Sequence, residues 1–136
     1  MATPHQQAEA ALTEYGLGLP ETEAGYGQHF IRLLRVRGRM FAIFGQKAQP
    51  ADQLTVTVKL PTSFEMVQDL WFVRESLGWY RQHQWAIAHF GANDDPRAEL
   101  PTLQAWMRQS YRAVAPKRLG RLISSAAYPG ASGEPG

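Results

Sequence analysis

The chain has 136 residues, which is enough for one domain with a hydrophobic core of its own. Hydrophobic residues make up 44% and charged residues 19%, a composition that excludes a wholly disordered, collagen-like or coiled-coil chain. Cysteine is absent, which excludes disulfides, thiolate zinc sites and cysteine nucleophiles, and the net charge at pH 7 is only +2.

No segment is typical of a membrane span or an export signal. No apolar run approaches the roughly 18 residues that cross a membrane, and the first residues, Met-Ala-Thr-Pro-His-Gln-Gln, lack the basic and then apolar pattern of a signal peptide. We therefore expect a cytoplasmic protein without membrane contact. Residues 124–136 are rich in Ser, Ala, Gly and Pro and should form a disordered tail after a single domain over residues 1–123.

The charges are distributed unevenly along the chain. Residues 1–25 contain four glutamates and no lysine or arginine, a local charge of −4. Residues 97–121 contain six arginines and lysines against Glu99 alone, a local charge of +5. This basic segment could attract a polyanion, or it could be the solvated face of a helix with a basic end.

The first predicted element is a helix over residues 5–15. Apolar side chains recur there at helical spacing, and Gly16, Gly18 and Pro20 end the pattern. The glycines in and after this stretch do not form a phosphate loop, because no strand leads into them and no Lys-Ser or Lys-Thr follows. We expect them at hinges and turns.

Residues 30–36 and 41–44 predict a β-hairpin. A two-residue loop of Gly38 and Arg39 would suit a type II′ turn, in which glycine takes the first central position. This loop predicts the pairs Arg37 with Met40, Val36 with Phe41 and Leu34 with Ile43. One face would then be core, and the other would carry Arg35, Arg37, Ala42 and Phe44.

Two further elements follow the hairpin. Residues 54–59 alternate Leu and Val with Thr and Lys, which is typical of a strand with one face in water. Residues 61–65 indicate a helix start, with Thr62 as the cap and Glu65 completing a capping box.

Three segments complete the predicted fold. Part of residues 71–80 is expected to be a strand, and residues 85–90 alternate clearly enough to predict another. A last helix should begin at Pro101 and end at Ala115, before Pro116. Its expected core stripe is Leu103, Met107, Tyr111 and Val114 with Trp106 at the edge, and its opposite ridge is Gln104, Arg108 and Arg112.

The order helix, three strands, helix, two strands, helix indicates an α+β fold. Hairpin-linked strands make the sheet mainly antiparallel. A two-layer sandwich with the helices on one face would bury that face of the sheet. The other face would stay largely open.

No constellation of residues is typical of a catalytic or metal site. No two histidines stand at the i, i+4 spacing of a helical zinc site; the four are His5, His29, His83 and His89. Asp94 and Asp95 lie in a loop, where such side chains commonly bond the nearby backbone. No serine has a nucleophile-elbow setting. We therefore expect no enzyme, no catalytic residue, no metal and no cofactor.

Arginines and hydroxyl groups around the hairpin are the remaining candidates for a binding surface. Guanidinium groups and Ser or Thr donors hold phosphate oxygens without reading bases, and a two-stranded ribbon can enter a groove of a duplex. Arginine at a hairpin tip can instead simply guard an edge strand against aggregation. The candidate nucleic-acid-binding residues are Arg35, Arg37, Arg39, Lys59, Arg108 and Arg112.

Five stretches recur in the order found in one protein family. They are residues 19–23 (Leu-Pro-Glu-Thr-Glu), residues 36–42 (Val-Arg-Gly-Arg-Met-Phe-Ala), the strand at 54–59, Trp85, and residues 110–115 (Ser-Tyr-Arg-Ala-Val-Ala). Over about residues 8–118 the chain resembles the MmcQ/YjbR-like family. The resemblance implies a secretion-chaperone-like α+β fold and DNA binding through a double-wing arrangement, with no established reaction or cofactor. It would place Arg35, Arg37 and Arg39 in or near one wing.

The sequence leaves three functions open. The first is a non-enzymatic module that binds DNA with low sequence specificity through the hairpin. The second is a protein-interaction or homodimerisation module that uses the open sheet face, including Met40, Ala42 and Phe44. The third is an enzyme whose pocket wall is the aromatic-rich region, although aromatic residues at such density more often fill a core. That region comprises Trp71, Trp79, Tyr80, His83 and Trp85.

Overall fold

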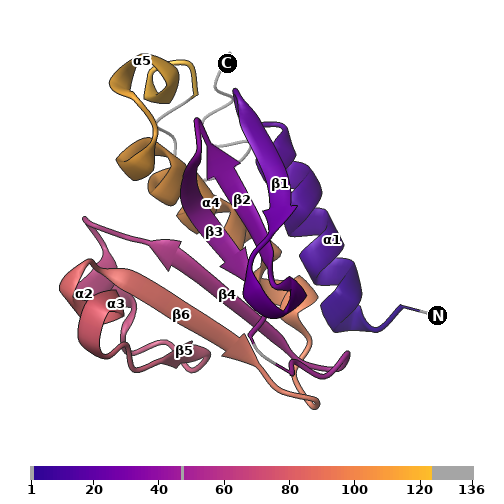
Figure 1. The fold of residues 1–136 in the computed structure, drawn as a ribbon. Coiled ribbons are helices and arrows are strands. Elements are labelled where there is room, and N and C mark those ends of the chain that lie inside the picture. Colours follow the sequence, from indigo (N-terminus) through magenta and orange to yellow (C-terminus); the bar gives the residue numbers. More distant parts are fainter. Residues whose placement is uncertain (1, 47, 124–136) are drawn as a thin grey trace.

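The computed structural model describes residues 2–46 and 48–123. These residues form an α+β fold in which one six-stranded antiparallel sheet carries its two long helices on one face (Figure 1). The fold class expected from the sequence is therefore confirmed. The expected disordered tail at residues 124–136 lies outside the described residues.

All five expected strands are present, and the polar edge strand β1 is a sixth. The strands are β1 (Thr22–Tyr26), β2 (Arg32–Val36), β3 (Arg39–Phe44), β4 (Leu54–Lys59), β5 (Val73–Arg74) and β6 (Trp85–Phe90), in the sheet order β1-β2-β3-β4-β6-β5. The helices are α1 (Pro4–Leu17), α2 (Phe64–Val67), α3 (Gly78–Gln82), α4 (Leu100–Val114) and α5 (Lys117–Gly120), with 3₁₀ turns at Gln28–Phe30 and Pro96–Glu99. No helix in the described part of the chain is long and apolar enough to cross a membrane.

Helix α1 begins one residue earlier than expected because its first turn is capped. The Thr3 hydroxyl accepts a hydrogen bond from the Gln6 amide at 3.1 Å, and the Gln6 side chain accepts one from the Thr3 amide at 3.0 Å. Gly16, expected as a hinge, is a packing residue. A Cβ at this position would overlap the Leu34 side chain and lie 2.9 Å from Met107 Cε. Gly16 thus lets α1 approach both the sheet and α4.

The β2–β3 hairpin is present, but the predicted turn and register are wrong. The turn consists of Arg37 and Gly38, with φ angles of 52° and 82°, and Val36 pairs with Arg39. Positive φ at both central positions is the type I′ pattern, whose twist matches that of a two-stranded ribbon. The prediction failed because it assumed that only glycine would adopt the left-handed conformation at the first central position of the turn, whereas Arg37 adopts it.

A β-bulge follows this turn. Arg35 pairs with Met40, and the next pair along the hairpin involves Ala42, so Phe41 is an extra residue in β3. Phe41 and Ala42 are both completely buried. Ala42 and Phe44 therefore belong to the core, and the patch expected on the open face is reduced to a partly exposed Met40.

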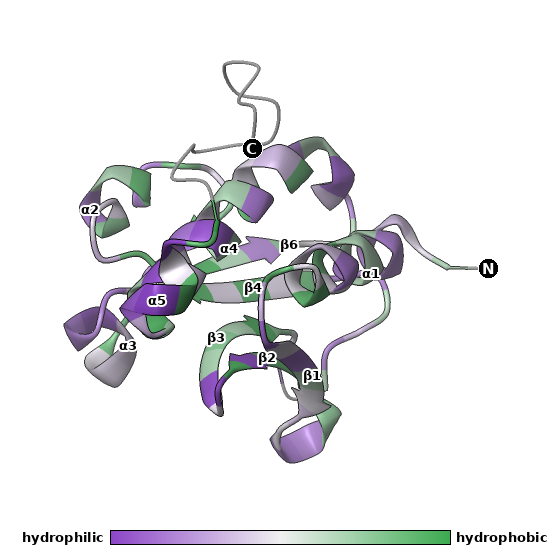
Figure 2. Ribbon diagram, turned by 90° about the horizontal axis from the view of Figure 1, so that it is seen from above, coloured by the Kyte–Doolittle hydropathy of each residue, from purple (hydrophilic) through white to green (hydrophobic). Residues whose placement is uncertain are grey.

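The expectation that the threonine face of β4 is in water is also wrong. Thr55 and Thr57 are only 3% and 6% exposed, because β4 is a central strand of a strongly curved sheet (Figure 2). Thr57 lies between Ile43 and Ile87 on the neighbouring strands. Thr55 Oγ1 is hydrogen-bonded to His89 Nδ1 at 3.0 Å.

The predicted capping box at residues 62–65 does not form. Helix α2 is a single turn with Ser63 at the cap position and no side-chain cap bond. The Thr62 hydroxyl instead donates to Gln109 Oε1 of α4 at 3.0 Å. Thr62, which was expected to cap the helix that follows it, therefore connects the start of α2 to α4.

Helix α4 covers the middle of the sheet, and its bounds agree with the prediction to within one residue. Leu103, Met107 and Tyr111 are completely buried, as expected, and Trp106 is 7% exposed. Val114 is only partly buried. The core is the layer between this helix, α1 and the facing side chains of β2, β3, β4 and β6.

Candidate nucleic-acid interface

Two basic segments that are far apart in sequence meet at one end of the molecule. The Tyr111 hydroxyl of α4 donates a hydrogen bond to the Pro20 carbonyl at 2.7 Å, which holds the neighbouring Glu21 beside α5. The Glu21 carboxylate lies 3.4 Å from Arg37 in the β2–β3 turn and 3.6 Å from Arg118 in α5. The turn and α5 accordingly lie at the same end of the fold (Figure 1).

We refer to this surface as the basic end. Its cations come from the hairpin, the last turn of α4, α5 and the residue after α5: Arg37, Arg39, Arg112, Lys117, Arg118 and Arg121. All six are exposed. A group of exposed cations of this size creates a positive potential that attracts a polyanion.

Three of these cations share one hollow. Arg112, Lys117 and Arg121 line a depression of about 290 Å³ at the junction of α4 and α5. Arg112 Nη1 donates to the Gly120 carbonyl at 2.7 Å and to the Ile123 carbonyl at 3.2 Å. These bonds hold the guanidinium in place, and its planar fork has further N–H donors with which to contact a phosphate.

Strands β3 and β4 separate next to the basic end. They pair over residues 42–44 of β3, and beyond that point Ser110 of α4 lies between them. Ser110 Oγ donates to the Phe41 carbonyl at 2.6 Å and accepts from the Lys59 amide at 2.9 Å. A side chain of α4 therefore replaces the backbone hydrogen bonds that β3 and β4 would have made with each other if their pairing had continued.

A hollow of about 390 Å³ opens where the strands separate, and we refer to it as the aromatic hollow. Besides the end of α4, its lining is Arg39, Met40, Lys59, Trp79, His83 and Trp85. The rings of Trp79 and Trp85 are stacked, with 5.9 Å between centroids and 25° between planes. Trp85 is 4% exposed, whereas Trp79 is 52% exposed.

The structure brings four of the six predicted binding residues to this region. Arg37, Arg39 and Arg112 belong to the basic end. Lys59 is half-buried in the wall of the aromatic hollow, where its Nζ donates to the His83 carbonyl at 2.7 Å.

The other two predicted residues lie elsewhere. Arg35 is half-buried on the open sheet face, and its guanidinium lies over β1, where a Cβ at Gly25 would be 3.1 Å from Nη1. Arg108 faces α1 and donates to the Tyr15 hydroxyl at 3.3 Å. Neither side chain joins the basic end.

Sequence reasoning did not assign Lys117, Arg118, Arg121 or Trp79 to a nucleic-acid interface. The charge count over residues 97–121 includes the three cations, but no local pattern places that segment beside the hairpin. Trp79 belongs to the aromatic-rich region considered as a pocket wall. Three members of that region, Trp79, His83 and Trp85, do line one hollow.

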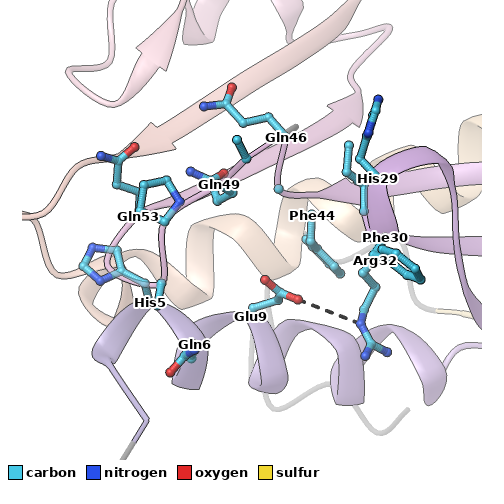
Figure 3. A pocket seen from close by; sticks show the side chains of 15 residues that line it. His5, Gln6, Glu9, His29, Phe30, Arg32, Phe44, Gln46, Gln49 and Gln53 are labelled. Atoms are coloured by element: carbon cyan, nitrogen blue, oxygen red, sulfur yellow. Dashed lines mark ion pairs between the residues drawn. The ribbon is translucent and has the colours of Figure 1, made fainter.

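A further pocket, of about 320 Å³, lies at the opposite end of β3, between α1 and the connections that precede β2 and follow β3 (Figure 3). Glu9 and Arg32 face each other there, with 3.9 Å between Oε2 and Nε. Burial raises the pKa of Glu9, and the charge of Arg32 opposes that shift. Because its two charges are of opposite sign, this pocket lacks the positive field that attracts a polyanion.

The remaining titratable groups of the described residues are isolated or paired with neighbours. Within residues 2–46 and 48–123, no cluster of three His, Asp or Glu side chains could hold a metal ion. Asp94 accepts a bond from the Gly91 amide at 2.7 Å, which is the backbone role expected for this loop. Hydrogen bonds from Arg97 lower the pKa of Asp95 to about 2, so this carboxylate is a paired surface group.

Sequence comparison finds no matching model of a known protein family and no matching curated protein. The MmcQ/YjbR-like resemblance therefore stays a prediction.

Proposed function

We propose that this protein binds nucleic acid through the basic end, by contacts to the phosphate backbone. The observation that carries the proposal is that Glu21 lies between Arg37 of the hairpin and Arg118 of α5, so that the two basic segments meet at one end of the fold. Cations that neutralise phosphates release condensed counterions, which makes such binding strong at low salt. Because phosphates are the same at every position, binding of this kind has low sequence specificity.

This proposal changes the site that the sequence predicted. The hairpin contributes Arg37 and Arg39, whereas Arg35 lies over β1 and Arg108 faces α1. The DNA binding implied by the family resemblance supports the proposal. A non-enzymatic, cytoplasmic role without a cofactor fits it, because nucleic acid is present in that compartment and phosphate contact needs no reaction.

The residues that suggested dimerisation through the open sheet face do not form an exposed apolar patch there. Ala42 and Phe44 are buried in the core, and Met40 lines the aromatic hollow. We therefore retain no second function for that patch.

The proposal is tested by fluorescence anisotropy of labelled mixed-sequence DNA across salt concentrations. The variant Arg37→Glu with Arg39→Glu should weaken binding at least about tenfold, and the slope of log K against log salt should fall by about 2. The matched control is Arg74→Glu with Arg97→Glu, which reverses two exposed arginines outside the basic end. Unchanged binding in the first variant, or an equal loss in the control, would overturn the proposal.

A further inference from the structure

We propose that the aromatic hollow takes one unpaired nucleobase, which stacks on Trp79, and that the protein therefore prefers single-stranded to double-stranded nucleic acid. This inference rests on the proposed function, because it adds a base-binding site to the phosphate-binding basic end. Its central residue, Trp79, does not belong to the basic end.

Trp79 is held in a fixed position and yet is half exposed. Its indole stacks on Trp85, which is fixed in β6 and almost completely buried. Tyr80 and His83 also contact it, with ring centroids 5.4 and 4.9 Å away. A ring that is already ordered loses little conformational entropy when a ligand stacks on it. Trp79 therefore has the properties of a stacking platform.

The backbone around Trp79 also limits its motion. Helix α3 has only five residues; its first residue, Gly78, has a φ angle of 56°, and Gln84, two residues after its end, has a φ angle of 62°. Lys59 Nζ bonds the His83 carbonyl at the end of this helix and so ties α3 to β4. The Trp79 indole lies beside the separated strands, where it lines the aromatic hollow.

Arg39 connects the hollow with the basic end, because it lines the first and belongs to the second. A strand whose phosphates lie on the basic end would pass the mouth of the hollow, and a base turned out of that strand would reach Trp79. Bases of a duplex are paired and stacked on each other, so they must first be opened at an energetic cost. An unpaired strand avoids that cost.

Much of the lining provides a surface on which a base can stack. Met40 and the two tryptophans provide polarisable, apolar surface, and Lys59 Nζ is already bonded to the backbone. Every base has a π face, so a platform of this kind accepts any of them. Low sequence specificity is thus expected at the hollow as well as at the basic end.

Trp71 supplies a matched control. It is 63% exposed, compared with 52% for Trp79, and it also packs on other rings, those of Phe72 and Phe90. Trp71 does not line the hollow. General loss of an exposed tryptophan can therefore be distinguished from loss of the stacking platform.

The experiment measures the affinity of the full chain for three labelled probes at one salt concentration. They are an oligothymidylate of about 15 nucleotides, a strand of equal length with abasic sites in place of the bases, and a duplex. Trp79→Leu should weaken binding of the oligothymidylate about tenfold and leave the abasic and duplex affinities within about twofold. Trp79→Phe should retain most of the affinity for the oligothymidylate. Trp71→Leu should leave the affinities for all three probes unchanged. Circular dichroism melting verifies that each variant is folded.

Oligothymidylate binding by Trp79→Leu at the affinity of the unmodified protein would overturn the stacking site. So would an equal loss with the abasic strand, or tighter binding of the duplex than of the single strand by the unmodified protein. If Arg37→Glu with Arg39→Glu still weakens all three probes in those cases, the proposed function stands without the stacking site. If that charge reversal has no effect, the proposed function itself fails.

Discussion

Ser110 and Phe41 are joined by a short hydrogen bond inside the fold, in which the Ser110 hydroxyl donates to the Phe41 carbonyl oxygen at 2.6 Å. The same Oγ accepts from the Lys59 amide at 2.9 Å. Ser110 is completely buried. One helix side chain thereby provides hydrogen-bond partners for the backbone of β3 and of β4 at the point where these strands separate. The two backbone groups beside the aromatic hollow are therefore not left unpaired.

Ser110→Ala should lower the free energy of unfolding by about 1–3 kcal/mol, because it leaves the buried Phe41 carbonyl and the partly buried Lys59 amide without their partner. Denaturation in urea measures this change. Gln104→Ala, on the partly exposed ridge of the same helix, should change the free energy by no more than about 0.5 kcal/mol. If the two variants lose the same stability, Ser110 does not have the bridging role described.

Arg37→Asn should affect stability and binding in opposite directions. Asparagine adopts the left-handed conformation of a type I′ turn with less strain than arginine, so the free energy of unfolding should rise by about 0.5–1 kcal/mol. The affinity for DNA should fall, because one cation of the basic end is lost. Urea denaturation and anisotropy measure the two effects.

Arg39→Asn is the control for that prediction. It removes the same charge from the same hairpin, but Arg39 lies in β3 rather than in the turn. We expect weaker DNA binding without a gain in stability. A loss of stability in Arg37→Asn would contradict the assignment of the turn to Arg37 and Gly38.

Glu21→Gln should strengthen DNA binding. The Glu21 carboxylate lies beside Arg37 and Arg118, where it reduces the positive potential of the basic end and repels phosphate. Neutralising it should raise the affinity about two- to fivefold at low salt, and the gain should shrink as salt screens the charge. Glu99 precedes the N-terminus of α4, at the other end of that helix from the basic end, so Glu99→Gln should leave the affinity unchanged. A gain of equal size in the control would show that only net charge matters.

His89 should make stability depend on pH. Burial, followed by the charge of Arg74, lowers the pKa of His89 from its ordinary value of 6.5. The unfolded chain therefore binds this proton more readily, so the stabilisation is present above pH 6.5 and is lost as the pH falls through the pKa of the folded state. The melting temperature should decline more steeply between about pH 7.5 and pH 5 in the unmodified protein than in His89→Gln. Identical slopes would argue against this shift.

Elements with strong apolar periodicity were predictable from local sequence alone. The strands at residues 54–59 and 85–90 coincide with β4 and β6, and α4 differs from its prediction by one residue at each end. Strand β1 was missed because Thr-Glu-Ala-Gly-Tyr has no apolar alternation, and its pairing with β2 holds it at the edge of the sheet. The hairpin register was wrong because a left-handed arginine and a bulge at Phe41 have no local signature in this sequence.

Residue types and short-range patterns were enough to establish an α+β chain with a basic hairpin and a second basic segment, because helical and strand periodicities and charge counts are properties of neighbouring residues. Long-range packing was needed to bring those two segments together beside Glu21 and to turn Arg35 and Arg108 away from them. It also decided that Trp79 lies half exposed beside the aromatic hollow. Contacts such as Tyr111 with Pro20 and Ser110 with Phe41 join residues 91 and 69 positions apart, so no local pattern could encode them.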